Sequence, residues 1–317
     1  MTSRRRTRVV TAAAALAGLV LFIYAIRQAG IAEILDGIRR VGWGLLLILA
    51  IGGARFLLRA ECWRLCVPRT EGGGGLSFAH AFVAFVAGDA VGTVTPLGLL
   101  ASEPTKIFLT RHHLATRESV SSLALENLVY AASVIAMIAA GIIVMLATVP
   151  LSPGWREGLA AALVVAAVGA VVAVFALRSG LGGLVPRSGW RDRLSALRQE
   201  LRQVDGGVLA RVFLLDLAYH ALAVLEVFVT LEWLLGDRSP TIAQAIVFEA
   251  LNRVVTVVFK FVPFRVGIDE ALTGALAPVL TLNAAAGVTL AVVRKVRNLF
   301  WAGVGLTLVA THPARSR

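Results

Sequence analysis

Two long apolar segments of this chain are each interrupted at a proline. The first break runs from Pro96 to Glu103, and the second runs from Pro263 to Glu270. Proline stops a helix because it lacks the amide donor and clashes with the preceding turn. A broken helix inside a bilayer leaves backbone groups without water, so such a break is tolerated only where protein or a wet cavity surrounds it. The acids that end both breaks favour a cavity.

The two breaks share one layout and lie about half the chain apart. In each the glutamate follows the proline by seven residues, each contains a glycine (Gly98 and Gly267), and the two prolines are 167 residues apart. Interrupted apolar segments at corresponding places in two halves are typical of transporters built from repeats, whose binding site lies between the breaks. Apolar sequence of low complexity also aligns by chance, and that alternative stays open here.

The composition excludes an ordinary soluble domain. Hydrophobic residues make up 58% of the 317 residues, charged residues only 16%, and the mean hydropathy is +0.81. These values are typical of a polytopic membrane protein. A formal net charge of +12 would suggest nucleic-acid binding in a soluble chain. Here the positive residues fall mainly between apolar runs, where membrane orientation and anionic headgroups explain them better, so we expect no nucleic-acid partner.

The apolar runs predict an all-α fold with six full spans and two broken re-entrant helical hairpins. The first unit, 1–150, has spans at 9–26, 41–58 and 118–148, its hairpin at 78–111 and an interfacial helix at 31–40. The second unit, 151–317, has spans at 158–177, 208–235 and 283–310, its hairpin at 241–280 and an amphipathic stretch in its basic loop. Each unit has three spans, an odd number, so the second enters the membrane from the opposite side, and the two repeats are inverted.

Charge bias predicts the orientation. If each hairpin returns to its own side, 18 Lys and Arg residues fall on one face and six on the other. The rich face then holds both termini, the central loop 178–207 and a polar linker after residue 58 that contains Arg59. By the positive-inside rule this face is cytoplasmic, and a bacterial-type cytoplasmic membrane is expected. The run 9–26 is expected to be an uncleaved helix, because it is longer than the core of a cleaved signal peptide.

Charged residues within the apolar runs are candidates for function, because they are costly at membrane depth. One face of the span 118–148 carries Glu118, Ser122, Glu126, Tyr130 and Ser133. Glu126 follows Glu103 by 23 residues, and Arg294 follows Glu270 by 24, so an acid and a base occupy nearly matching positions. Two readings stay open: the pair lines a polar cavity at the junction of the halves, or it is a structural salt bridge.

Other polar residues are weaker candidates. Asp216 and His220 are four apart on one helix, which suits a proton relay, although a contact between helices is the favoured reading. Arg253, near the second break, is placed to meet an anionic headgroup. Cys62 and Cys66 lack the spacing of a redox or metal motif, so unpaired packing cysteines are expected. We predict no metal and no cofactor.

Several short stretches resemble one membrane family over nearly the whole chain. Besides the two breaks, they are Glu61-Cys62-Trp63-Arg64-Leu65, Glu232-Trp233-Leu234-Leu235-Gly236, Phe248-Glu249-Ala250-Leu251 and Arg294-Lys295-Val296-Arg297. With these the chain resembles the transmembrane region of lysylphosphatidylglycerol synthases, the flippase-like family, and most of all its stand-alone, hopanoid-associated members. It departs from the family pattern at Ala101-Ser102, and at Phe264 and Arg265, where glycines are usual. The aminoacyl-transferase domain is not expected.

The resemblance implies a lipid translocator, not an enzyme. It would move an anionic phospholipid, aminoacyl-lipid, glycolipid or polyprenyl or hopanoid lipid between leaflets. The substrate-binding candidates are Glu103, Glu126, Arg253, Glu270, Arg294 and Arg297. Two alternatives remain: a membrane-embedded lipid-headgroup enzyme with Glu126 or His220 as general base, and a non-transporting partner of a lipid or glycan synthesis complex. Whether the protein forms a homo-oligomer is left open.

Overall fold

The computed structural model describes residues 31–68, 75–95, 98–178, 205–236, 239–259 and 262–311. The predicted span 9–26, Pro96 and the amphipathic stretch of the central loop lie outside these ranges. Every regular element within them is helical, which confirms the predicted all-α class. The elements are α2 (Ile31–Val41), α3 (Gly44–Cys66), α4 (Phe78–Val94), α5 (Gly98–Thr110), α6 (Thr116–Thr148), α7 (Pro153–Arg178), α9 (Gly206–Leu235), α10 (Ile242–Val258), the 3-10 turn η1 (Pro263–Arg265), α11 (Ile268–Val279) and α12 (Ala284–Thr311).

The second predicted span differs from α3 at both ends. Helix α2 ends in a turn at Gly42, whose φ is +41°, and the chain bends by 74° before α3 starts at Gly44. Helix α3 then continues to Cys66, so the prediction that Arg59 lies in a polar linker is wrong. Arg59 lies within α3, and its side chain is buried. Acids from two other helices, Glu126 and Asp216, pair with its guanidinium.

Two of the described helices, α6 and α9, are long and apolar enough to cross a membrane by length and composition. A third candidate arises if the bent pair of α2 and α3 counts as one broken span. These helices fall where three of the six predicted spans were placed. The total of six spans stays a prediction.

Helices α4 and α5 form an antiparallel hairpin. A Cβ added at Gly98 would lie 2.4 Å from the carbonyl oxygen of Gly92, so glycine is required where the two helices separate. Farther from the turn, Gly88 faces Lys106. Gly92 contacts Gly98 and Gly88 contacts Lys106, so residues earlier in α4 meet residues later in α5. The chain therefore doubles back between the two helices.

The second break has a similar form. Gln244, at the start of α10, donates a hydrogen bond of 2.8 Å to the carbonyl oxygen of Leu280, which follows α11. The two arms therefore begin and end at the same place. Gly267 has a φ of +83° and its backbone N–H donates to Glu270, so this glycine and this acid together start α11.

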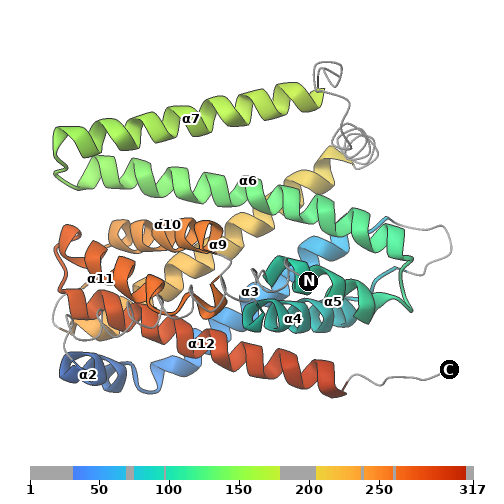
Figure 1. The fold of residues 1–317 in the computed structure, drawn as a ribbon, viewed down its shortest axis with the longest axis horizontal. Coiled ribbons are helices and arrows are strands. Elements are labelled where there is room, and N and C mark those ends of the chain that lie inside the picture. Colours follow the sequence, from blue (N-terminus) through green and yellow to red (C-terminus); the bar gives the residue numbers. More distant parts are fainter. Residues whose placement is uncertain are drawn as a thin grey trace, which may run out of the picture.

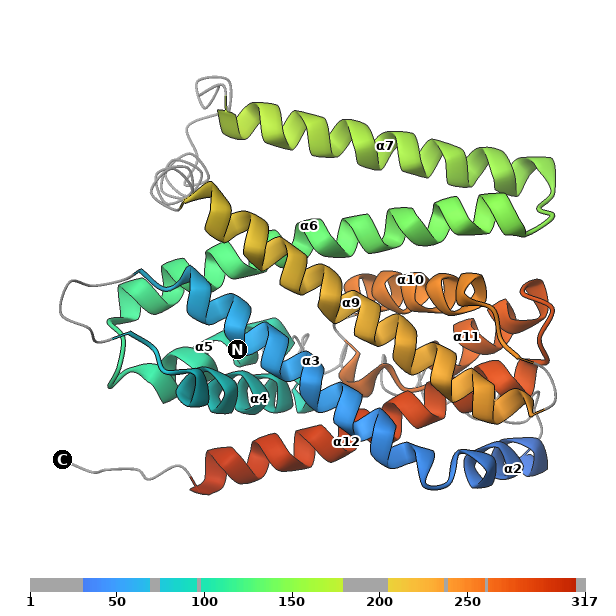
Figure 2. The ribbon, with the colours of Figure 1, turned by 180° about the vertical axis from the view of Figure 1, so that it is seen from behind.

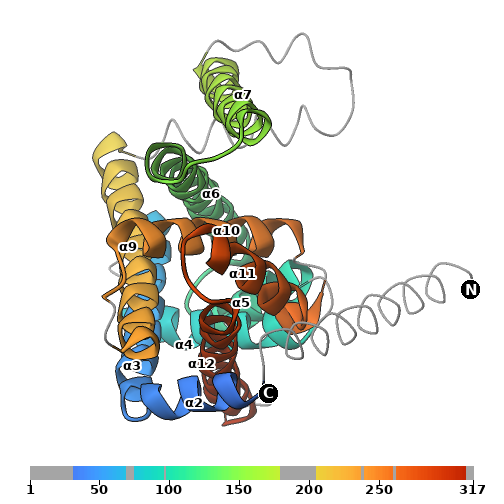
Figure 3. The ribbon, with the colours of Figure 1, turned by 90° about the vertical axis from the view of Figure 1, so that its left-hand side faces the viewer.

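The halves of the chain are interleaved. Helices α3 and α9 run side by side, α4 packs on α12, and α10 packs on α6 (Figures 1 and 2). Gly141 of α6 faces Ala250 of α10, and Gly305 of α12 faces Ala90 of α4, so small residues allow both contacts to be close. Helix α7 lies on the outer side of α6 and away from the other helices (Figure 3).

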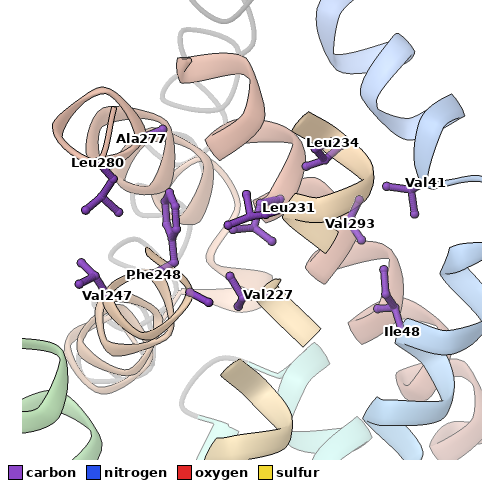
Figure 4. Packing of buried hydrophobic residues seen from close by; sticks show 12 residues of the cluster. Val41, Ile48, Val227, Leu231, Leu234, Val247, Phe248, Ala277, Leu280 and Val293 are labelled. Carbon is purple, nitrogen blue, oxygen red and sulfur yellow. The ribbon is translucent and has the colours of Figure 1, made fainter. Parts of the chain in front are cut away.

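Apolar packing and charge are distributed as in a membrane protein. The largest apolar cluster joins α9, α10, α11 and α12 around Phe248 and Leu231, with Ile48 of α3 at its edge (Figure 4). Large apolar side chains also cover the outside: Trp43 is 88% exposed and Val165 is 72% exposed. Many charged side chains are buried instead. An apolar exterior around a charged interior suits a protein surrounded by lipid.

Candidate functional site

A cavity of about 310 Å³ lies among the helices of both halves. It is lined by side chains from α3, α4, α5, α6, α9, α10, η1, α11 and α12, so the arms of both hairpins reach it. The lining cations are Arg55, Arg59, Lys106, Arg253, Arg265, Arg294 and Arg297, and the lining acids are Asp89, Glu103 and Asp269. The walls are therefore predominantly positive. Three asparagines, two tyrosines and several aromatic rings complete them.

The first charge cluster consists of Arg59, Glu126 and Asp216. Arg59 of α3 lies 2.7 Å from a carboxylate oxygen of Glu126 on α6 and 3.2 Å from Asp216 on α9. The thiol of Cys62, one turn further along α3, also lies 3.7 Å from Asp216. All three charged residues are buried, and only Arg59 lines the cavity.

The second charge cluster consists of Glu226, Arg55 and Arg297. Glu226 of α9 accepts a hydrogen bond of 3.1 Å from Arg55 on α3 and another from Arg297 on α12. Its composition is the reverse of the first cluster, with one acid between two bases. Both arginines line the cavity and the glutamate does not.

The third charge cluster consists of Glu249, Arg253 and Arg294. Glu249 of α10 lies 2.5 Å from Arg253 on the same helix and 3.2 Å from Arg294 on α12. Asn252 donates a further hydrogen bond of 3.2 Å to this glutamate. Again the arginines line the cavity while the acid lies behind them.

Two tyrosines lie among the arginines of these clusters. The Arg59 guanidinium lies 3.7 Å from the ring centroid of Tyr130, and that of Arg55 lies 4.3 Å from that of Tyr219. Arg253 also donates a hydrogen bond of 3.2 Å to the Tyr130 hydroxyl. Cation–π contacts hold a guanidinium in place without neutralising it. The tyrosines therefore orient cationic groups at the cavity wall.

Each hairpin break carries its own acid and lysine. Lys106 lies 2.9 Å from Glu103 within α5, and both line the cavity. Glu270 of α11 pairs with Lys295 of α12 and accepts the Gly267 N–H at 2.8 Å. Glu270 is fully buried and does not line the cavity. Through these two contacts Glu270 stabilises the start of α11 at the second break, outside the cavity lining.

The comparison with known protein families shows to which family the chain belongs. The model of the lysylphosphatidylglycerol synthase TM region matches residues 9–305. The chain belongs to this family. No curated protein and no solved structure gives a significant match.

Within this member of the family, the structure brings most of the predicted binding residues together. Glu103, Arg253, Arg294 and Arg297 line the cavity, as does Gly98 at the first break. Glu126 lies behind Arg59 and does not line it. The suggested pairing of Glu126 with Arg294 is not formed, because each binds a nearer partner on another helix.

Asp216 and His220 point to different partners. Asp216 binds Arg59, whereas Nε2 of His220 lies 3.2 Å from the Ser133 hydroxyl of α6. Both are buried and neither lines the cavity. These are contacts between helices, the reading that the sequence favoured over a proton relay. Cys62 and Cys66 are free and buried, as expected.

Sequence reasoning did not select several residues of the site, among them Arg55, Arg59, Glu226 and Glu249. A signal existed in their spacing, since Arg55 and Arg59 are four apart, as are Glu249 and Arg253, and so share a helix face. Ending the second predicted span at residue 58 separated the first pair. The partners that explain these charges lie far away in the sequence, as with Arg59 and Asp216.

Proposed function

We propose that this protein is an integral membrane lipid translocator, which moves a lipid between leaflets without changing it chemically. Membership of the family supports a lipid-related role in the membrane. The observation that carries the proposal is the cationic cavity, enclosed by helices whose outer side chains are apolar. The headgroup would occupy the cavity while the acyl or polyprenyl chains stay in the bilayer.

The charge distribution favours an anionic headgroup. In the three charge clusters the arginines line the cavity, while the acids Glu126, Asp216, Glu226 and Glu249 do not. The acids that pair with the guanidiniums lie outside the cavity lining, so the charge that faces the cavity from these clusters is positive. Guanidinium groups match the oxygens of phosphate geometrically and bind them by charge-assisted hydrogen bonds. We therefore propose that the ligand carries phosphate, as anionic phospholipids, aminoacyl-lipids and polyprenyl phosphates do.

We also propose that the two halves are inverted repeats with six spans and two re-entrant hairpins. Arg59 joins α3 to α6 and α9, and Glu226 joins α9 to α3 and α12. Exchanging α3 with α9 and α6 with α12 converts one cluster into the other, with the charges reversed. Arg59 and Glu226 are 167 residues apart, the same separation as Pro96 and Pro263. This agreement supports a repeat over chance alignment of apolar sequence.

Reconstitution tests the proposal. The purified protein in liposomes should expose labelled anionic phospholipid to a membrane-impermeant quencher faster than protein-free liposomes do. Arg297→Gln should slow this movement about tenfold if one phosphate contact of about 1.4 kcal/mol is lost. Arg64→Gln is the matched control, because Arg64 pairs with Glu61 at an exposed position. Folded variants are identified first by their thermal unfolding in detergent.

Mass spectrometry of the recovered lipids separates the proposal from its alternatives. A translocator leaves the mass of the lipid unchanged, whereas an enzyme acting on the headgroup changes it. The proposal would be overturned if the protein moved none of phospholipid, aminoacyl-lipid, glycolipid and polyprenyl phosphate. With the lipid masses also unchanged, the remaining alternative would be a non-transporting partner of a synthesis complex. The same assay in the reverse orientation gives the direction of movement.

A further inference from the structure

The turn between α10 and α11 has an unusual backbone for its residues. Phe264 has φ of 51° and ψ of 2°, and Arg265 has φ of 47°. Left-handed conformations are costly for residues with a Cβ, and two in succession are rarer still. Such strain persists only where surrounding structure enforces it, and it is concentrated at functional sites.

Firm contacts on both sides enforce this conformation. Val262 is buried against Val255 and Ile268, and its carbonyl oxygen accepts the Arg265 N–H at 3.1 Å. On the other side Gly267 is fixed by the Glu270 carboxylate. The strained pair therefore lies between two anchored points. Both of its side chains line the cavity.

Arg265 differs from the other arginines of the cavity in its partner and its exposure. Its Nε lies 3.1 Å and 3.2 Å from the two oxygens of Asp269, and this acid also lines the cavity. The side chains of the pair are 21% and 15% exposed. The next most exposed lining cation, Arg297, is 11% exposed, and its acid Glu226 is 2% exposed.

This difference decides which ion pair can open. Removing an arginine from a buried acid leaves an uncompensated charge in a dry environment, which is strongly unfavourable. Asp269 is open to the cavity, where water or a ligand cation can solvate it when Arg265 leaves. Lys106 also pairs with a lining acid, Glu103, but the Lys106 side chain is only 4% exposed and its ammonium lies 3.9 Å from the ring centroid of Phe85. Among the described lining residues, Arg265 is therefore the cation that an entering anion can most easily reach and separate from its partner.

We propose that Arg265 is the exchangeable anion-recognition residue of the cavity, which leaves Asp269 for the phosphate of an entering lipid. The left-handed backbone at Phe264 and Arg265 holds the guanidinium at the cavity wall in the empty state. This inference rests on the proposed function, because it names the residue that selects the lipid charge.

Lipid-dependent thermal stabilisation in detergent tests the inference without a transport assay. A ligand that binds the folded protein raises the unfolding temperature according to its concentration and affinity. Phosphatidylglycerol is the anionic probe and phosphatidylcholine is the zwitterionic one. Arg265→Gln should weaken the apparent affinity for phosphatidylglycerol about tenfold, the loss of one charged hydrogen bond. Asp269→Asn should strengthen it several-fold, because the competing acid is neutralised.

A second pair of variants tests the strained backbone. Phe264→Gly keeps the charge of Arg265 but frees the turn, so it should weaken phosphatidylglycerol binding. Thr281→Gly is the matched control, because Thr281 also has a positive φ, of 62°, but is exposed and does not line the cavity. It should leave binding unchanged. The inference would be overturned if Arg265→Gln bound phosphatidylglycerol as tightly as the wild-type protein does. It would also be overturned if Phe264→Gly and Thr281→Gly changed phosphatidylglycerol binding equally.

The two proposals fail separately. If the wild-type protein moves lipid and Arg265→Gln moves it with the same preference for anionic headgroups, the inference is wrong and the proposed function stands. If phosphatidylglycerol stabilises the protein through Arg265 but no lipid moves, the inference stands and translocation is wrong.

Discussion

At the scale of single residues, the interior contains charged side chains that each pair with more than one opposite charge. Each acid or base at the centre of a charge cluster binds two opposite charges, at least one of them from another helix. Buried ion pairs are weak evidence for stability compared with apolar packing, but removing one partner is costly because a charge is left unpaired. The clusters therefore fix which helices lie together more than they add to the free energy of unfolding.

Glu249→Gln tests this reasoning. The substitution leaves Arg253 and Arg294 both buried without an acid, so we expect it to destabilise the protein by about 3–5 kcal/mol. Glu61→Gln breaks a local pair with Arg64, whose side chain is 42% exposed, and should change stability by less than about 1 kcal/mol. Thermal unfolding in the same detergent measures both. Equal shifts would mean that the third charge cluster has no structural role.

At the scale of helices, the fold depends on close contacts between elements of different halves. Helix α6 reaches α10 at Gly141, where an added Cβ would lie 2.0 Å from the Cβ of Ala250. Helix α12 reaches α4 at Gly305 in the same manner. Close backbone approach through small residues is a common basis of helix association in membranes, where apolar burial against lipid contributes little.

Gly141→Leu should separate α6 from α10 and destabilise the protein by about 1–3 kcal/mol, the usual cost of overpacking. Gly158→Leu in α7 is the control, since nothing lies within 4 Å of a Cβ added there. Leucine is a better helix former than glycine by up to about 1 kcal/mol, so the control should be neutral or slightly stabilising. Unfolding temperatures in detergent distinguish these outcomes, and a destabilised control would point to lost helix–lipid contacts instead.

At the scale of the whole molecule, two hairpins and three charge clusters surround one cavity. The arms of each hairpin begin and end at the same place, as the 3.8 Å separation of the His80 and His113 ring centroids and the bond from Gln244 to Leu280 require. In the proposed inverted arrangement the two hairpins enter the bilayer from opposite sides, and the cavity lies between their turns.

Accessibility of single cysteines tests this topology. In a background with Cys62 and Cys66 replaced by alanine, Ser77→Cys and His112→Cys flank the first hairpin, and Ser239→Cys and Thr281→Cys flank the second. All four positions are exposed. A membrane-impermeant thiol reagent should label the first two from the cytoplasmic side and the last two from the outside. Labelling of Ser77→Cys and His112→Cys from opposite sides would mean that α4 and α5 together cross the membrane.

The sequence by itself determined the helices and their breaks. Apolar periodicity, proline and glycine act over a few residues, so they placed α6, α9, α12 and both hairpins close to their observed positions. The polar face of α6 was visible for the same reason, and Ser122, Glu126, Tyr130 and Ser133 all contact residues of other helices.

Only the tertiary structure decided which charges meet. Glu126 and Arg294 occupy matching positions in the sequence, yet Glu126 binds Arg59 and Arg294 binds Glu249. The energy of an ion pair depends on distance and burial in three dimensions, and neither follows from separation along the chain. The left-handed turn at Phe264 and Arg265 was also not predicted, because the packing of Val262 against α10 and α11 enforces it against the local preference of both residues.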